Sequence, residues 1–288
     1  MSLEALGSLV EPFWFMGLAL TYLPGTILVC LRAGDLGTLL SPGRLRELWF
    51  ARFWASVGPG LRDMGSKNVV PLVQGRVTHG VVPPAALAGD DQRGQPHPHP
   101  AVSGTVLEVG PGSGLWVSLF SPSSLPGVSK VYGVEPNPSL HPALRQRISE
   151  AGLDESGTYE IVPVGIEDLE SSGRVAAESV DCIITLKCLC SIPSPEHNIR
   201  QLYRYLKPGG RWYVYEHVRC FPEQGIAMRV YQYLLGFVWP RIIGGCQITR
   251  DTGRYLREAG PWSHVDLHPL AGEQWFFTLP SIIGVLTK

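Results

Sequence analysis

The sequence has almost no net charge. Its 288 residues include 24 lysines and arginines and 25 aspartates and glutamates, which gives a formal net charge of -1. A chain with this balance has no overall positive field that would attract a polyanion. It also lacks a basic stripe interleaved with aromatic residues, the pattern that binds single-stranded nucleic acid. We therefore expect no nucleic acid among its partners.

Cysteine is scarce and follows no regular spacing: the six residues are Cys30, Cys182, Cys188, Cys190, Cys220 and Cys246. The separation of Cys188 and Cys190 is too short for the usual ligand pairs of a structural zinc site. The sequence therefore predicts no metal centre. Free thiols in a cytosolic compartment are the simplest interpretation, and we expect Cys188, Cys190 and Cys246 to be core residues.

Charge is completely absent from residues 12–31, which form a strongly apolar run. A helix of this length measures about 30 Å, the thickness of a bilayer core. Pro24 and Gly25 interrupt the run, so we expect the helix to cross with a kink or to return as a hairpin, with a buried core helix as the alternative. Glu4 and Glu11 argue against a cleaved signal peptide. The arginines that follow favour a cytoplasmic body.

Two segments follow before the first clear strand. Residues 45–54 predict a helix rich in tryptophan and arginine, which fits a membrane interface or ordinary packing on the rest of the protein equally well. Residues 82–104 are rich in proline and glycine and predict a loop or linker. His97 and His99 within this loop lie among prolines and form only a weak candidate pair for metal binding.

A glycine-rich turn comes next. Residues 105–109 predict a buried parallel strand, and it leads into Gly110, Gly112 and Gly114. Glycine leaves room for a ligand close to the backbone and accepts positive φ. The dinucleotide fingerprint requires its third glycine at position 115, which is Leu115 here, so an NAD-dependent oxidoreductase is disfavoured. Glu108 suits a ligand that carries an ammonium group.

Strands and helices alternate through the rest of the chain. Strands are predicted at residues 131–134, 159–164, 179–186 and 212–216, and helices at residues 115–120, 140–151 and 196–206. This order predicts a doubly wound parallel sheet with the ligand at the carboxyl ends of the strands. A helix over residues 249–259 with Thr249 as its cap, and two closing strands at residues 265–268 and 282–286, complete the pattern.

Several motifs now agree in order and spacing. They are Leu107-Glu108-Val109-Gly110-x-Gly112-x-Gly114, Pro136-Asn137-Pro138, Leu189-Cys190-Ser191, Leu206-Lys207-Pro208-Gly209-Gly210, Glu216-His217-Val218 and Gly245-Cys246-x-Ile248-Thr249-Arg250. With them, residues 64–288 resemble the methyltransferase-like 7 family. These are membrane-associated class I S-adenosylmethionine (SAM) methyltransferases of the endoplasmic reticulum and lipid droplets that methylate lipophilic thiols. The chain departs from that pattern at Pro111, at Glu135, where aspartate is commoner, and in the insertion before the glycine turn.

The resemblance implies a seven-stranded Rossmann-like methyltransferase sheet with an N-terminal apolar membrane-associating segment. It divides the chain into a membrane segment (1–60), a helix and linker (61–104) and a methyltransferase domain (105–288) with an acceptor lid at about 221–245. It also implies SAM as the cofactor, bound by Glu108, Gly110, Gly112, Gly114, Glu135, Pro136, Asn137, Ile166, Glu167, Thr185 and Leu186. The carboxylate of Glu135 would bind the ribose, and residues 166–167 would meet the adenine.

His217 is the candidate catalytic residue, because it ends the fifth strand on the side where the acceptor must lie. It is interpreted as a base or as a group that orients the acceptor, with a purely structural role as the alternative. The function expected is methyl transfer to a small lipophilic acceptor, first of all a thiol. The alternatives are an O- or C-methyltransferase of a phenol, quinone or polyketide in secondary metabolism, and a SAM-binding protein without methyl transfer that serves as an interaction module or rearrangement catalyst.

Overall fold

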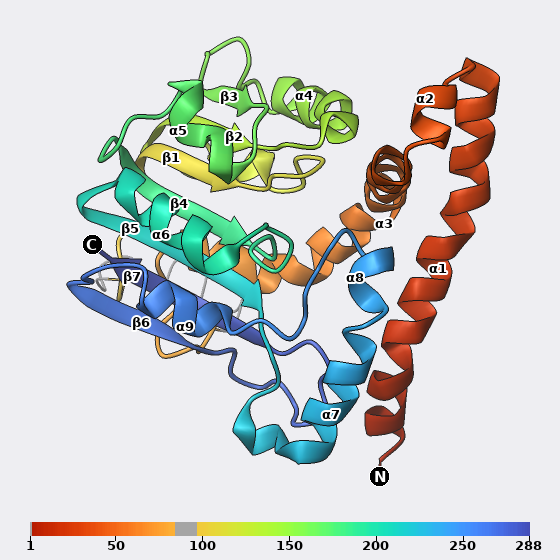
Figure 1. Cartoon of the computed structure of the whole chain (residues 1–288). Helices are drawn as coiled ribbons and strands as arrows, with labels where there is room; N and C mark the ends of the chain where they lie inside the picture. The colour runs from red at the N-terminus through yellow and green to blue at the C-terminus, as the bar shows by residue number, and fades with distance from the viewer. Residues whose placement is uncertain (1, 84–96) are drawn as a thin grey trace.

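The computed structural model describes residues 2–83 and 97–288, and its centre is a seven-stranded sheet (Figure 1). The strand order is β3-β2-β1-β4-β5-β7-β6. The strands are β1 (Gly104–Val109), β2 (Val128–Val134), β3 (Tyr159–Val162), β4 (Val180–Leu186), β5 (Leu206–His217), β6 (His264–Pro269) and β7 (Ser281–Thr287). Strand β7 is antiparallel to both of its neighbours, and the other pairs are parallel. The doubly wound, Rossmann-like methyltransferase sheet predicted from the sequence is confirmed.

Helices connect the strands and cover the sheet. The longer ones are α1 (Leu3–Ala33), α3 (Pro42–Val73), α4 (His141–Glu150), α6 (Pro195–Tyr205) and α7 (Gly225–Leu235). The short ones are α2 (Leu36–Leu39), α5 (Leu169–Ser172), α8 (Trp239–Ile242) and α9 (Thr252–Arg257), with 3-10 turns η3 (Val117–Phe120), η4 (Pro138–Leu140), η5 (Ile166–Asp168) and η6 (Pro222–Gln224). In Figure 1 the parallel strands point toward the side where α3, α8 and α1 lie.

Alternation along the central strands divides the core into two layers. Leu107 and Val109 of β1 belong to the layer that packs on α6 and α9, whereas Val106 belongs to the layer that packs on α3 and α4. Strand β4 behaves in the same way, with Ile183 on the first side and Ile184 on the second. Because successive side chains of a strand point to opposite faces, a continuous apolar run is what a sheet covered on both faces requires.

Helix α1 is continuous, so the expected hairpin at Pro24 is wrong. Both Pro12 and Pro24 lie inside the helix. Proline removes one backbone hydrogen bond and crowds the preceding turn, but contacts with α3 hold the turns of the helix just before Pro24. Trp49 donates a hydrogen bond to the carbonyl of Ala19 over 2.7 Å, and the Tyr22 hydroxyl donates to Ser56 over 2.6 Å.

Other local predictions also need correction. The helix expected at residues 115–120 is only the 3-10 turn η3, because the turns of the glycine loop continue to Trp116. The cap of α9 is Asp251 and not Thr249, since Asp251 accepts a hydrogen bond from the Arg254 N–H. Strand β5 begins at Leu206, so the Pro-Gly-Gly hinge lies inside it. Residues 84–96, which make up most of the predicted linker, lie outside the described residues.

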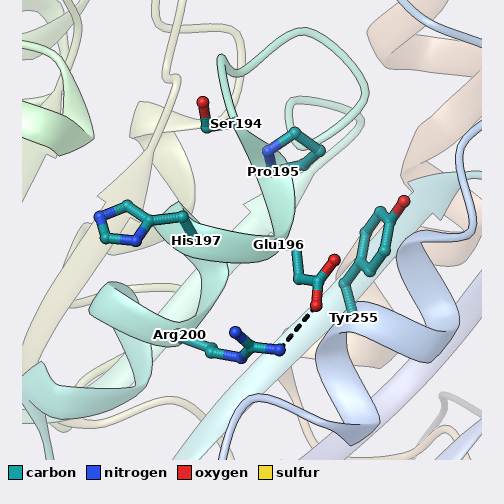
Figure 2. Close-up of a pocket in the computed structure, with 6 residues that line it drawn as sticks. All are labelled: Ser194, Pro195, Glu196, His197, Arg200 and Tyr255. Carbon is teal, nitrogen blue, oxygen red and sulfur yellow. Dashed lines mark hydrogen bonds and ion pairs between the residues drawn. The ribbon is translucent and has the colours of Figure 1, made fainter.

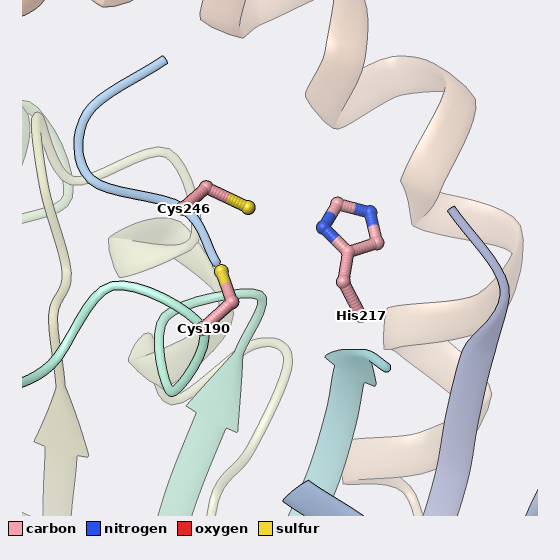
Figure 3. A group of neighbouring side chains, drawn as sticks. All are labelled: Cys190, His217 and Cys246. Carbon is pink, nitrogen blue, oxygen red and sulfur yellow. The ribbon is translucent and has the colours of Figure 1, made fainter. Parts of the chain in front are cut away.

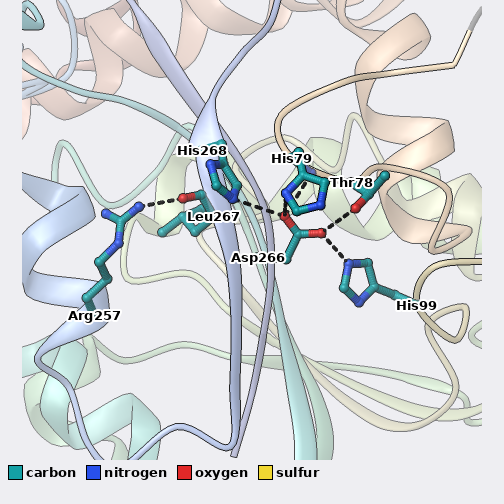
Figure 4. Close-up of polar contacts among 7 residues, drawn as sticks. All are labelled: Thr78, His79, His99, Arg257, Asp266, Leu267 and His268. Atoms are coloured by element: carbon teal, nitrogen blue, oxygen red, sulfur yellow. Dashed lines mark hydrogen bonds and ion pairs between the residues drawn. The ribbon is translucent and has the colours of Figure 1, made fainter.

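A buried carboxylate attaches the segment after α3 to the edge of the sheet. Asp266 of β6 accepts hydrogen bonds from the Thr78 hydroxyl, the backbone N–H of His79 and His99 Nε2, at 2.9, 2.8 and 2.7 Å (Figure 4). His268 Nε2 lies 3.4 Å from the same carboxylate. Although burial opposes ionisation, these bonds lower the pKa of Asp266 below its ordinary value. His99 therefore helps to attach this segment to β6.

Replacing Asp266 with alanine should lower the free energy of unfolding by about 3 kcal/mol, because several buried donors would lose a charged acceptor. Denaturant titration of the purified protein measures the change. Asp63→Ala is the matched control: its side chain is 75% exposed, and we expect a change within about 0.5 kcal/mol. Equal effects of the two substitutions would contradict the anchoring role of Asp266.

Candidate active site

The glycine turn lies at the carboxyl end of β1. Gly110, Gly112 and Gly114 adopt φ angles of +64°, +61° and +82°, a region that other residues enter at a cost. A Cβ on Gly110 would lie 2.8 Å from Cβ of Cys188, so this position has no room for a side chain. The loop therefore brings bare backbone to the end of the sheet.

Glu135 holds this turn from the end of β2. One carboxylate oxygen accepts the backbone N–H of Gly112 over 2.9 Å, and the other accepts the N–H of Asn137 over 2.9 Å. Burial raises the pKa of Glu135, and the two backbone hydrogen bonds act against that rise. Pro136 and Asn137 begin the turn that follows, so the predicted ribose-binding residues and the glycine turn are brought together.

Glu108 points away from open solvent. Its side chain is 3% exposed, and one carboxylate oxygen accepts the hydroxyl of Tyr159 over 2.5 Å. Burial raises the pKa of Glu108 to about 7 despite this hydrogen bond, and the nearby Glu135 adds to the rise. Tyr159 thus already uses one of the two carboxylate oxygens of Glu108. The contact of Glu108 with a ligand ammonium group stays a prediction.

Helix α3 lies across the glycine turn, which the sequence did not indicate. A Cβ on Gly112 would lie 3.7 Å from the indole nitrogen of Trp54, and Gly58 leaves room for the side chain of Leu115. The Asn137 amide donates to the carbonyl of Glu47 over 3.3 Å. Together with the buried Trp49 and Phe53, these contacts favour the packing interpretation of residues 45–54 for the aromatic side chains.

The remaining predicted cofactor residues lie at the ends of β3 and β4. Ile166 is buried in η5, and Glu167 beside it is exposed. Thr185 is completely buried, where its hydroxyl accepts the Trp212 indole N–H over 3.0 Å, and Leu186 is half-buried. The side chain of Thr185 is thus part of the core, and only its backbone is left for a ligand.

Glu216 connects the ends of β4 and β5. Its carboxylate accepts the backbone N–H groups of Cys188 and Leu189, each over 3.1 Å. The side chain is fully buried, and burial raises the pKa of Glu216 to about 7, against the effect of these hydrogen bonds. The loop after β4 is thereby fixed between Glu216 on one side and the glycine turn on the other.

His217 lies at the end of β5 and faces two cysteines. Cys190 from the loop after β4 and Cys246 from the loop after α8 have their sulfur atoms beside its ring (Figure 3). Burial, together with the charge of Lys187, lowers the pKa of His217 well below its ordinary value, so the ring is neutral near pH 7. Among the described residues no group forms a hydrogen bond with its buried Nδ1. A neutral, unpartnered nitrogen is available here for chemistry.

A shallow depression also occurs elsewhere on the surface, at the start of α6. Figure 2 shows its lining: Ser194, Pro195, Glu196, His197, Arg200 and Tyr255. Glu196 and Arg200 form an ion pair across it at 2.6 Å. It contains none of the predicted site residues, and its charged groups are neutralised by each other, so it offers no competing active site.

Comparison with known proteins assigns this arrangement to a family. A sequence family described as a methyltransferase domain matches residues 89–260, more than half of the chain. The chain belongs to this methyltransferase family. The methyltransferase is similar to thiol S-methyltransferase TMT1B of Rattus norvegicus, with 31% identity over 190 residues that cover 64% of this chain and 70% of the relative. Thiol S-methyltransferase TMT1A of Homo sapiens is 30% identical over 185 residues, with the same coverage.

A solved structure shows the same fold along nearly the whole methyltransferase. It belongs to a candidate O-methyltransferase from Nostoc punctiforme PCC 73102, and the TM-score is 0.53 at 13% identity, covering 98% of this chain and 72% of that one. The protein is thus a SAM-dependent methyltransferase with SAM as its cofactor. The residues present fit that cofactor, because glycines expose the backbone at the end of β1 and an acidic residue ends β2.

Three residues lie beside the predicted site residues without a sequence signal that placed them there. Cys190 and Cys246 are buried in the core, as expected, but they also lie beside His217. Trp54, for which a membrane interface and packing were both considered, lies against Gly112. The signal for Cys190 is its place just after β4, next to the strand that ends in His217, because neighbouring parallel strands bring their carboxyl ends together. Cys246 follows the segment of α7 and α8, whose path no sequence pattern determines.

Glu135→Ala should weaken SAM binding by the methyltransferase at least about tenfold, because it removes a charge-assisted acceptor and releases Gly112 of the turn. Isothermal titration calorimetry with SAM measures the affinity. Glu135→Asp keeps the carboxylate and should retain part of the affinity, and the exposed Glu155→Gln is a control that should retain all of it. An unchanged affinity in Glu135→Ala would mean that the ribose is bound elsewhere.

Proposed function

We propose that the protein transfers the methyl group of SAM to the thiol of a small lipophilic molecule at a membrane surface. The observation that carries the proposal is His217 at the end of β5, whose neutral ring has a buried nitrogen without a hydrogen-bond partner among residues 2–83 and 97–288. The relatives named thiol S-methyltransferases support the same acceptor class.

An apolar enclosure around His217 supports a lipophilic acceptor. Cys190 and Cys246 belong to a buried cluster that joins α1, α3 and the segment of α7 and α8. Its other members are Met16, Ala19, Trp49, Phe53, Leu235, Trp239, Ile243 and Ile248. We propose that the segment from α7 to α8 is the acceptor lid. A molecule that reaches His217 past these side chains must be largely apolar, because unpaired polar groups are costly to bury there.

Methyl transfer requires little from the protein beyond the alignment of the acceptor with the methyl group. The cofactor supplies an electrophilic methyl group on a sulfonium, and the acceptor sulfur must approach it in line. A free thiol has a pKa of about 8.5 and is partly ionised near neutrality, so a single group that orients the sulfur is enough. We propose that His217 is that group. The cofactor is held by the glycine turn, by Glu135 to Asn137 and by the ends of β3 and β4.

Membrane association is proposed from exposed apolar side chains on the neighbouring helices α1 and α7. Helix α1 is long and apolar enough to cross a bilayer, and 22% of its most apolar window is buried. Its outer side chains, including Phe13 and Trp14, adjoin α7, where Phe13 packs on Tyr231 at 6.4 Å between ring centroids. Exposed apolar residues of α7 and the turn after it extend this surface: Ile226, Val230, Tyr233, Leu234, Phe237 and Val238. Such a surface is typical of contact with lipid.

The packing of α1 favours an orientation along the membrane rather than across it. The Tyr231 hydroxyl donates to the carbonyl of Leu9, and Ser8 donates to the carbonyl of Phe276 over 3.2 Å. Ala19 and Tyr22 of α1 also form hydrogen bonds with α3. Together these contacts attach α1 to the domain over much of its length. We propose that the protein lies on the cytosolic face of the endoplasmic reticulum or of lipid droplets, with this surface in the lipid.

An acceptor panel tests the reaction. We expect methyl transfer from labelled SAM to lipophilic thiols, and much slower transfer to phenols and other hydroxyl compounds of matched size. His217→Ala should lower kcat for thiols at least about tenfold and leave the affinity for SAM unchanged. Transfer to phenols or quinones alone would support the O- or C-methyltransferase alternative. SAM binding without transfer to any acceptor would support a protein that has lost methyl transfer.

Vesicle binding tests the proposed membrane surface. The double substitution Phe13→Asp and Trp14→Asp should reduce the fraction bound to phosphatidylcholine vesicles several-fold, because it puts charges into the surface that meets lipid. Transfer to a water-soluble thiol should be unaffected. Val81→Glu is the control, since Val81 is 52% exposed in the turn beside β6, away from α1. Equal vesicle binding of the double variant and the wild type would contradict the proposal.

A further inference from the structure

Cys190, His217 and Cys246 offer three metal-ligating atoms at one point. Each residue supplies one such atom, and the three atoms lie within 4.8 Å of one another. The residues come from the loop after β4, the end of β5 and the loop after α8. In Figure 3 one ring nitrogen of His217 is on the side of the two sulfur atoms. Three residues that are far apart in the sequence therefore bring metal-ligating atoms to one place.

The donor set is the one that zinc selects for sites with an open position. Two thiolates and an imidazole leave the fourth place of a tetrahedron free for water or a substrate. At zinc distances of about 2.3 Å to sulfur and 2.0–2.1 Å to nitrogen, the ligand atoms of a tetrahedron lie about 3.5–3.8 Å apart. The observed spacing allows this arrangement after small side-chain rotations. No fourth His, Cys, Asp or Glu joins the group within the part of the chain that is described.

The surroundings give independent support. The buried Nδ1 of His217 has no hydrogen-bond partner among the described residues, and an orphaned buried atom of this kind indicates a partner that the protein chain does not supply. The loop that carries Cys190 is held by Glu216 and by Arg250, which donates to the carbonyl of Leu189 over 2.7 Å. Ligands whose backbone is fixed in this way are pre-arranged for a metal.

We propose that Cys190, His217 and Cys246 bind Zn²⁺ and that the thiol of the acceptor occupies the fourth coordination position. The inference rests on the proposed function, because it requires a thiol as the acceptor. Zinc would explain selectivity for sulfur: a coordinated thiol is deprotonated outright, and sulfur is a soft ligand that the ion retains in preference to an alcohol. His217 then acts as a ligand that positions the ion.

The reaction balances without any further reagent. On binding zinc the acceptor's S–H bond breaks, and its proton leaves to water. A lone pair of the resulting thiolate forms a bond to the methyl carbon of SAM, and the electron pair of the broken carbon–sulfur bond stays on the cofactor's sulfur. The positive charge of SAM and the negative charge of the thiolate cancel. The neutral thioether is a weaker ligand than the thiolate and is released.

Metal analysis of the full-length protein tests the site directly. We expect the purified protein to hold one zinc per chain, and Co²⁺ exchanged into it to show thiolate-to-metal charge-transfer absorption. We expect zinc binding to weaken at least about 100-fold in each of the variants Cys190→Ser, Cys246→Ser and His217→Ala. Loss of a residue that only supports a ligand costs up to about 100-fold, and these three are the ligands themselves. Cys182→Ser is the matched control, because Cys182 is buried within β4 away from the group, and it should keep full metal content.

Two further measurements distinguish the loss of a zinc ligand from a failure of the variant to fold. Cys246→His retains a zinc ligand and should keep the metal with an altered Co²⁺ spectrum, and SAM binding by calorimetry checks that each variant is folded. A wild-type protein that takes up no zinc, or whose zinc survives both cysteine substitutions, overturns the inference. If a chelator removes the zinc and thiol methylation continues unchanged, the metal role fails while the proposed function stands. Zinc at these residues with no methylation of any thiol would instead overturn the proposed function.

Discussion

The buried carboxylate of Glu216 is the contact on which the arrangement of the site depends. It takes the backbone N–H groups of Cys188 and Leu189 and so fixes the loop after β4 against the end of β5. Cys188 in turn lies against Gly110, where a side chain would not fit. The glycine turn and the residues around His217 are thus linked through one short loop. A shift of that loop would move both halves of the site together.

The second organising feature is the apolar cover over the carboxyl ends of the strands. Helices α1 and α3 and the segment of α7 and α8 meet in one buried cluster above His217. The outer sides of α1 and α7 carry exposed apolar side chains. We propose that a methyltransferase built in this way takes its acceptor from a lipid surface. Burial also keeps His217 neutral, which is the form of the imidazole that ligates a metal.

The sequence predicted the sheet and the position of the glycine turn well, because those features are local. Strand β1, the three glycines and Glu135 lie in short continuous motifs whose geometry is determined by nearby residues. The cover and the acceptor side depend on packing between distant segments, which no local pattern reports. The sequence could not decide whether Trp54 contacts a membrane or packs on the protein, because a helix rich in tryptophan and arginine has the same sequence pattern in both cases. Rules based on the spacing of cysteines along the sequence do not pair Cys190 with Cys246, because the two residues are far apart in the sequence and become neighbours only in the folded protein.

The most direct test of this account is a crystal structure of the full-length protein with S-adenosylhomocysteine and zinc. The account predicts the ribose at Glu135, the amino acid part along Gly110 to Gly114, and the cofactor's sulfur facing a zinc ion held by Cys190, His217 and Cys246. A cofactor bound in the glycine turn with its sulfur directed away from these three residues would contradict the claim that methyl transfer takes place beside His217.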